Sequence, residues 1–241
     1  MHPMDYFQQI YIVNLAHRAD RRLEMEVQLK SIGLSFYTHN IVLFPACRPD
    51  NSGGFTSIGA RGCFLSHLAI LRDAGAKGFD RILILEDDLN FSAGFMERIG
   101  GITNLLEVEN WHIFYGGYFL PTALPEFPAG MEVVKISPLS DIQTSHFIGF
   151  RGSAIDKVSK FLEALLGRQA GDKDGGPMHV DGAYNCFRRI NSDQTTLLAV
   201  PELGYQRSSR TDIHVLRWFD RMPGFRHAVD GLRSLRNKFS R

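Results

Sequence analysis

The sequence predicts an α/β fold in a single domain, with a Rossmann-like mixed sheet flanked by helices. Three observations predict it. The first ~90 residues alternate apolar and amphipathic segments in the order β-α-β-α-β, which is typical of a parallel sheet that binds nucleotides. One apolar segment runs directly into Glu86, Asp87 and Asp88, as a strand entering a ligand site does. No internal repeat or linker divides the 241 residues.

The first half of the chain contains the clearest elements. Continuous apolar runs predict strands at 10–15, 41–44 and 81–86, and amphipathic spacing predicts helices at 19–33 and about 61–74. The run Ile82-Leu83-Ile84-Leu85 has no polar face, so we expect a central parallel strand that is buried on both sides.

The second half is less regular. A strand is predicted at 111–115, ended by Gly116-Gly117, and three prolines indicate a surface loop at 120–130. The remaining predictions are helices at 95–106, 153–166 and 179–190, and strands at 132–136, 145–150 and 196–200.

Composition restricts the class of protein. The net charge is +1, which argues neither for nor against nucleic acid, and the three scattered cysteines suit a reducing compartment. The first residues lack the layout of a signal peptide, and no apolar run approaches ~20 residues. We therefore expect a soluble, cytoplasmic protein.

The acidic cluster is the strongest chemical signal. Adjacent carboxylates repel one another, and burying them is costly unless a cation or strong donors compensate. Glu86 and Asp88, two residues apart in extended chain, are expected to point the same way and to suit Mg²⁺ or Mn²⁺. The alternative is a solvated acidic turn.

Basic residues follow the first strand. Arg18 and Arg21 lie one helical turn apart near a helix start, so their guanidinium groups are expected to converge on one anion. The alternative, favoured by these residues alone, is a helix whose basic face meets solvent.

Two further groups carry side chains capable of chemistry. Ser66 and His67 lie on a largely apolar helix, where a buried, hydrogen-bonded pair is the commoner explanation, and no nucleophile elbow surrounds them. Asp181 lies near the start of a late helix, where it can cap the helix, bind a metal through water or act as a base.

Taken together and in order, these motifs resemble glycosyltransferase family 25, which includes lipooligosaccharide β-galactosyltransferases and collagen galactosyltransferases. The resemblance covers about residues 10–213. It rests on N-L-x-x-R-x-D-R-R at 14–22, G-C-x-x-S-H at 62–67, L-E-D-D at 85–88, His146, Gly152-Ser153-Ala154, V-D at 180–181, P-x-L-x-x-Q at 201–206 and T-D-I at 211–213. The chain departs from the family pattern at 47–50 and 111–112, beside the expected donor loops.

The resemblance implies a GT-A-like fold. It also implies an inverting, metal-dependent transfer of a hexose from a UDP-sugar to a hydroxyl of a saccharide acceptor, with galactose as the expected hexose. The expected cofactor is Mn²⁺ or Mg²⁺, and the expected role is bacterial lipooligosaccharide or surface polysaccharide synthesis. Asp181 is the expected base, with His146 as a second catalytic choice. The expected metal ligands are Glu86, Asp88 and Asp212. The expected donor-binding residues are Asn14, Leu15, Arg18, Arg21, Ala46, Ser66, His67, Glu86, Asp87 and Gln206.

The predicted domain spans 1–216, with a nucleotide-binding half at 10–92 and an acceptor-binding half at 93–216. Residues 217–241 form a basic tail in which seven Lys and Arg are interleaved with large apolar residues. Such a tail can lie on anionic lipid, which would place the protein at the inner face of the membrane beside a lipid-linked acceptor. A solvated C-terminal helix is the alternative.

Three other functions compete with this one. A metal-dependent phosphohydrolase also uses strand-end carboxylates, but the sequence shows no second acidic cluster. A dinucleotide-dependent oxidoreductase lacks its G-x-G-x-x-G after the first strand. A catalytically inactive nucleotide-binding protein is the main alternative outside enzymes. We expect no nucleic acid partner.

Overall fold

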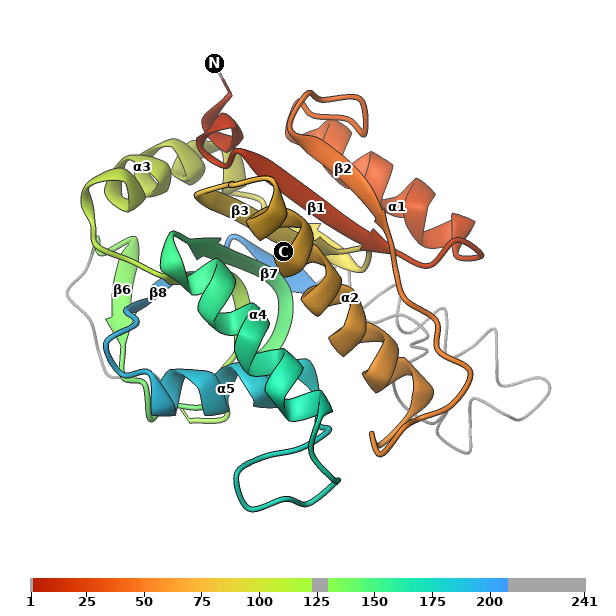
Figure 1. Ribbon diagram of the computed structural model, residues 1–241. Helices are drawn as coiled ribbons and strands as arrows, with labels where there is room; N and C mark the ends of the chain where they lie inside the picture. Colours follow the sequence, from red (N-terminus) through yellow and green to blue (C-terminus); the bar gives the residue numbers. More distant parts are fainter. Residues whose placement is uncertain (1, 123–129, 208–241) are drawn as a thin grey trace.

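Helices cover both faces of a central sheet in the computed structural model, which describes residues 2–122 and 130–207 (Figure 1). The first half of the chain contains η1 (Pro3–Tyr6), β1 (Gln9–Asn14), α1 (Ala19–Ser31), β2 (Ile41–Pro45), α2 (Ile58–Ala76), β3 (Arg81–Glu86), β4 (Leu89–Phe91) and α3 (Phe95–Val108). The second contains β5 (Ile113–Phe119), β6 (Val133–Ile136), β7 (Gln143–Arg151), α4 (Ser153–Leu166), α5 (Val180–Ile190), β8 (Thr196–Ala199) and β9 (Gly204–Gln206). The expected mixed α/β single domain is confirmed.

The main sheet has seven strands in the order β2-β1-β3-β7-β5-β8-β6. β1 pairs in parallel with both β2 and β3, as the β-α-β-α-β alternation predicts. On its other side β3 pairs antiparallel with β7, so the sheet is mixed, as expected, and the predicted central parallel strand is parallel to one of its two neighbours. The carboxyl ends of β1, β2 and β3 therefore meet the amino end of β7 at one edge of the sheet.

Side chains alternate between two cores, one on each face of the sheet. Ile82 and Ile84 pack into the core beneath α2, α4 and α5, whereas Leu83 and Leu85 pack against η1, α1 and α3. Figure 1 shows α2, α4 and α5 together on one face. Since β3 is buried on both faces, it stays apolar throughout, as its sequence predicts.

The expected end of β5 at Gly116-Gly117 is also wrong, because the strand continues to Phe119. Both glycines are needed inside the strand by close packing. A Cβ on Gly116 would lie 2.6 Å from the Phe147 ring, and one on Gly117 would lie 2.6 Å from the carbonyl oxygen of Gly204. These glycines mark close approach of neighbouring segments and do not mark a turn.

A small second sheet joins β4 to β9, with Leu89 opposite Gln206. The sequence predicts no strand at 89–91, because three residues carry too little pattern. This pairing holds the segment after the acidic cluster against the end of the described chain. None of the helices in residues 2–122 and 130–207 has the combination of length and hydropathy that spanning a bilayer requires.

We expect Gly117→Ala to destabilise the fold by about 1–3 kcal/mol, because the new methyl group would press on backbone at Gly204 and on the His146 ring. Thermal and urea unfolding measure the change. The matched control is Gly100→Ala inside α3, where the nearest atom lies 3.9 Å away and a gain of about 0.5–1 kcal/mol is expected. Equal stability of Gly117→Ala and the parent would contradict this packing.

Candidate active site

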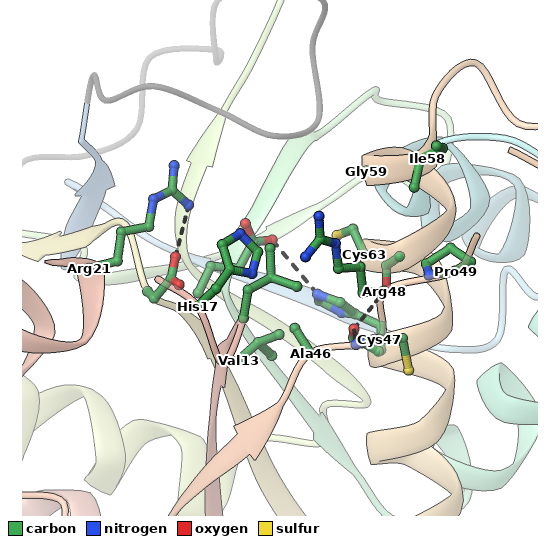
Figure 2. Close-up of a pocket in the computed structure, with 16 residues that line it drawn as sticks. Val13, His17, Arg21, Ala46, Cys47, Arg48, Pro49, Ile58, Gly59 and Cys63 are labelled. Carbon is green, nitrogen blue, oxygen red and sulfur yellow. Dashed lines mark hydrogen bonds and ion pairs between the residues drawn. The ribbon is translucent and has the colours of Figure 1, made fainter. Parts of the chain in front are cut away.

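A cavity of about 280 Å³ opens where the carboxyl ends of β1 and β2 face the first half of α2. Figure 2 shows the residues that line it, with Cys63 on α2 facing the strand ends. The lining includes the expected residues Leu15, Arg21, Ala46, Ser66, His67, Glu86 and Asp87, together with His17, Cys47, Arg48 and Cys63. The sequence motifs from three separate elements therefore meet in one place, at the edge where open α/β sheets bind ligands.

A second, smaller cavity of about 90 Å³ also borders Glu86. Its lining comes from α2, the end of β3, the start of β7, the start of α5 and β9: Ala60, Cys63, Glu86, Thr144, Ser145, His179, Val180, Asp181 and Gln206. Cys63 and Glu86 line both cavities. A ligand in the first cavity and a ligand in the second would thus meet beside Glu86.

The acidic residues divide between two sets of partners. The strand ends at Glu86 and turns, so Glu86 and Asp88 do not point the same way as expected from extended chain. Asp87 accepts hydrogen bonds from Asn14 Nδ2 at 2.7 Å and from the Arg21 guanidinium at 2.9 Å. The same guanidinium lies 3.4 Å from Asp88. Arg21 therefore neutralises part of the charge of both aspartates.

Glu86 faces a different group of side chains. It accepts a hydrogen bond from Ser145 Oγ at 2.9 Å, and His67 Nε2 lies 3.7 Å from its Oε1. Burial raises the pKa of this carboxyl, but the nearby His67 and the Ser145 hydroxyl outweigh that effect, so the pKa lies below its ordinary value. Glu86 is therefore held as a carboxylate.

Asp88 is the least compensated of the three. It is 5% exposed, and burial, followed by the negative charges of Glu86 and Asp87, raises its pKa to about 7 against the opposing effect of Arg21. Gln206 Nε2 donates to its Oδ2 at 3.3 Å, while Oδ1 is buried with no hydrogen-bond partner among the described residues. A buried, unpartnered carboxylate oxygen under negative potential fits a ligand for a hard divalent cation.

Arg18 pairs with a different carboxylate from those that Arg21 contacts. Its guanidinium pairs with Asp20, on the same helix, at 2.8 Å, so the expected convergence of Arg18 and Arg21 on one anion is not observed. The reason is local: Asp20 lies two residues from Arg18 and accepts hydrogen bonds from its guanidinium group. Arg21 pairs directly with the side chains of the acidic cluster and so connects α1 to it.

Ser66 and His67 are buried and hydrogen-bonded, as the apolar helix around them predicts. Ser66 Oγ donates to the Gly62 carbonyl at 2.7 Å and accepts from the backbone N–H of Cys47 at 2.8 Å, so it fixes the loop after β2 to α2. His67 Nδ1 lies 2.8 Å from the hydroxyl of Tyr184 on α5. Both side chains also border the first cavity.

Asp181, the expected base, lies on the second cavity. Its Oδ2 accepts the backbone N–H of Thr144 at 3.2 Å, and its Oδ1 accepts the N–H of Gly182 at 2.7 Å. Thr144 has a φ of 67°, which is rare for a β-branched residue and costs of order 1–3 kcal/mol. Such strain occurs preferentially at functional sites.

His146, the second catalytic choice, is buried near Glu86. Its ring is buried between Thr144 Oγ1 at 3.0 Å and the Gly204 carbonyl at 3.4 Å, and it borders neither of the two cavities. Burial lowers the pKa of His146, which favours the neutral ring. We assign it to packing between β7 and β9. Asp212, the third expected metal ligand, lies outside the described residues.

Besides His17, Cys47 and Arg48, which line the first cavity, four residues of the site were missed from the sequence: Cys63, Thr144, Ser145 and Tyr184. Cys63 had a signal, because it stands four residues before His67 and so shares its helix face. Burial, together with the nearby Glu86, Asp181 and Asp88 carboxylates, raises the pKa of the Cys63 thiol. The other three residues join the site only through the pairing of β7 with β3 and the packing of α5 on α2.

Part of the chain is similar in sequence to a known protein family. The family model described as "Glycosyltransferase family 25 (LPS biosynthesis protein)" matches residues 7–119. This segment contains β1, β2, β3, α2 and the whole acidic cluster. The resemblance read from the motifs is confirmed over this segment, whose sequence is similar to that of glycosyltransferase family 25.

Curated relatives extend the match. "Inactive glycosyltransferase 25 family member 3" of Homo sapiens is 30% identical over 129 residues, which is 46% of this chain and 22% of that protein. "Procollagen galactosyltransferase 1-B" of Xenopus laevis is 26% identical over 167 residues, which is 61% of this chain and 27% of that protein. The matched segments span about a quarter of the length of these relatives.

Among solved structures, a glycosyltransferase involved in the glycosylation of the major capsid of PBCV-1 aligns with a TM-score of 0.40 and 11% identity. The alignment covers 84% of this chain and 93% of that one.

We expect Asp88→Asn to stabilise the metal-free protein at pH 8 by roughly 1–3 kcal/mol, because the amide removes a poorly compensated buried charge. The folded pKa is raised, so the contribution of native Asp88 to stability is full below its unfolded pKa of 3.8 and is lost as pH rises through about 7. The gain should therefore shrink by pH 5. Urea unfolding in EDTA at both pH values measures it.

Asp80→Asn is the matched control, since Asp80 precedes the opposite end of β3 and is exposed. A stability difference between Asp88→Asn and the parent that is the same at pH 5 and pH 8 would contradict the raised pKa.

Proposed function

We propose that this protein is an inverting, metal-dependent glycosyltransferase. It moves a hexose from a UDP-sugar to a hydroxyl of a saccharide acceptor, and galactose is the hexose that we expect. One observation carries the proposal: two cavities share Glu86 of the acidic cluster, and Asp87 lines the first cavity while Asp181 lines the second. The family 25 match over this segment supports the reaction class.

The first cavity suits the donor. Its lining combines apolar strand ends with Arg21, Arg48 and His17, so it offers both a surface for a nucleoside and positive charge for a diphosphate. Arg21 already lies against Asp87 and Asp88, where it would help to place diphosphate oxygens beside those carboxylates. Gly62 keeps this wall compact, since a Cβ there would lie 2.6 Å from the Cys47 carbonyl oxygen.

The residues present fit a hard divalent cation such as Mn²⁺ or Mg²⁺. Asp88 has a buried oxygen free of partners among the described residues, and its raised pKa reflects negative charge that a cation would offset. Asp88 would hold the ion, helped by Glu86 and Asp87. When bound, such an ion neutralises charge on a diphosphate leaving group as a Lewis acid.

Asp181 is the group we assign to the acceptor. Its carboxylate is oriented by two backbone N–H groups and borders the second cavity, which shares Glu86 with the first. A carboxylate there would accept the proton of the attacking hydroxyl on the face opposite UDP, an effect worth ~10²–10⁴-fold in rate. The strained backbone of Thr144 holds the N–H that orients Asp181.

A catalytically inactive nucleotide-binding protein is the second candidate, because several of the similar curated proteins are described as inactive or probable inactive. Against it stand the uncompensated Asp88 and the oriented Asp181, which a binding protein without chemistry would not need together. A phosphohydrolase has weaker support, since the family match is to glycosyltransferases.

The acceptor is not defined by the cavities. A lipid-linked saccharide of lipooligosaccharide synthesis, presented at the inner membrane face, remains a prediction from the basic tail at 217–241. This tail lies outside the described residues.

The direct test is a screen of UDP-Gal, UDP-Glc, UDP-GlcNAc and UDP-GalNAc with Mn²⁺, reading released UDP, and isothermal titration of UDP. We expect UDP-Gal to be the preferred donor, EDTA to abolish turnover, and Asp88→Ala to lose both turnover and metal-dependent UDP binding while circular dichroism stays native. Asp80→Ala, at the other end of β3, is the control. Metal-dependent transfer at the parent rate in Asp88→Ala would refute the site, and no release from any donor would favour the inactive alternative.

We expect Asp181→Asn to reduce kcat by at least ~10²-fold while the Kd for UDP stays within about threefold, because a base acts on the acceptor and leaves donor binding intact. Asp193→Asn, an exposed acid after α5, is the matched control. If Asp181→Asn instead weakens UDP binding and keeps its kcat, Asp181 belongs to the donor site and not to the base.

A further inference from the structure

Cys63, His67 and Glu86 form a group that the proposed reaction does not use as a unit. One potential ligand atom from each residue lies within 4.8 Å of the other two. Cys63 and His67 are four residues apart on α2 and so share one helix face, and Glu86 ends β3 opposite that face. A thiol, an imidazole and a carboxylate together are the ligand types of a zinc site.

The position and contacts of the His67 ring suit such a site. Its ring is fully buried, and Nδ1 lies 2.8 Å from the Tyr184 hydroxyl. Nε2 has no hydrogen-bond partner among the described residues and points toward Glu86, 3.7 Å from Oε1. A histidine that binds a metal through one nitrogen usually donates the other N–H to a fixed acceptor, and the Tyr184 oxygen can accept it.

The spacing is close to what a metal needs. Tetrahedral Zn²⁺ with bonds of about 2.0–2.3 Å separates its ligand atoms by about 3.3–3.8 Å. The Nε2 to Oε1 distance of 3.7 Å already falls in this range. The other separations between ligand atoms are at most 4.8 Å, so a side-chain movement of about 1 Å brings them into this range.

Charge and access also favour a cation. The carboxylates of Glu86, Asp181 and Asp88 place negative charge around the Cys63 thiol. Cys63 and Glu86 border both cavities, so an ion can reach them from solvent and keep one coordination position open to water or substrate.

We propose that Cys63, His67 and Glu86 bind a borderline-soft divalent cation of the Zn²⁺ class, at a site distinct from the one that Asp88 provides for Mn²⁺ or Mg²⁺. On binding, the Cys63 sulfur gives up its proton to solvent and bonds to the metal as a thiolate. A hard cation does not compete well for this set, because sulfur and imidazole are poor ligands for Mg²⁺.

The proposal has a consequence that rests on the proposed transferase function. Glu86 is common to both sites, so an ion on Cys63 and His67 withdraws it from the acidic cluster and obstructs the junction of the two cavities. Zn²⁺ should therefore inhibit Mn²⁺-dependent transfer.

A test that does not depend on transferase activity is to titrate the EDTA-treated full chain with Co²⁺, a spectroscopic substitute for Zn²⁺. We expect one equivalent to produce a thiolate-to-cobalt charge-transfer band that one equivalent of Zn²⁺ abolishes. Cys63→Ser should lose the band, and His67→Gln should weaken Co²⁺ affinity at least ~10-fold. Cys47→Ser, which removes a thiol from the same cavity but outside the group, should keep the band.

Asp88→Asn separates the two metal sites, because it should keep the cobalt band. Zinc K-edge absorption of the native chain, with one sulfur per zinc expected, gives a measurement that needs no variant. No band in the native protein, a band retained in Cys63→Ser, or a band lost in Cys47→Ser would each overturn the proposal. The first result would mean that His67 and Glu86 are only a buried polar contact. A cobalt band without transferase activity would leave this site standing and refute the proposed function.

Discussion

The burial of three consecutive carboxylates at the end of β3 is the constraint on which this structure depends. Removing such charges from water costs several kcal/mol each unless they are compensated. The charge of Asp87 is compensated by Asn14 and Arg21, and the charge of Glu86 by His67 and Ser145. The compensation is incomplete at Asp88, and that deficit is the feature that makes the edge of the sheet a site for a cation.

The compensating groups come from almost every part of the described chain. Asn14 ends β1, Arg21 lies on α1, His67 on α2, Ser145 on β7 and Gln206 on β9. Folding must bring these five elements together before the carboxylates can be desolvated. The packing of the sheet and the electrostatics of the site are therefore one problem, and a fault in either is expected to affect the other.

The sequence carried enough information to predict part of this arrangement. Strands at 10–15, 41–44 and 81–86 have continuous apolar runs, and the acids at 86–88 follow such a run directly, so their place at the sheet edge was predictable. The insertion of β7 beside β3 was not predictable, because an antiparallel neighbour leaves no mark on the strand that it pairs with. The roles of Thr144 and Ser145 depend on that pairing. For the same reason, Gly116-Gly117 resembles a turn until the rings of His146 and Phe147 are in place.

The antiparallel partner of β3 has a meaning for how this fold can be divided. The segment matched by the family model, 7–119, stops before β7 begins at Gln143. Cut at that boundary, the fragment would present the backbone N–H and C=O groups of β3 as an open, apolar edge, which favours strand exchange and aggregation between copies. The segment matched by the family model and the physical unit thus have different limits, because the physical unit includes β7.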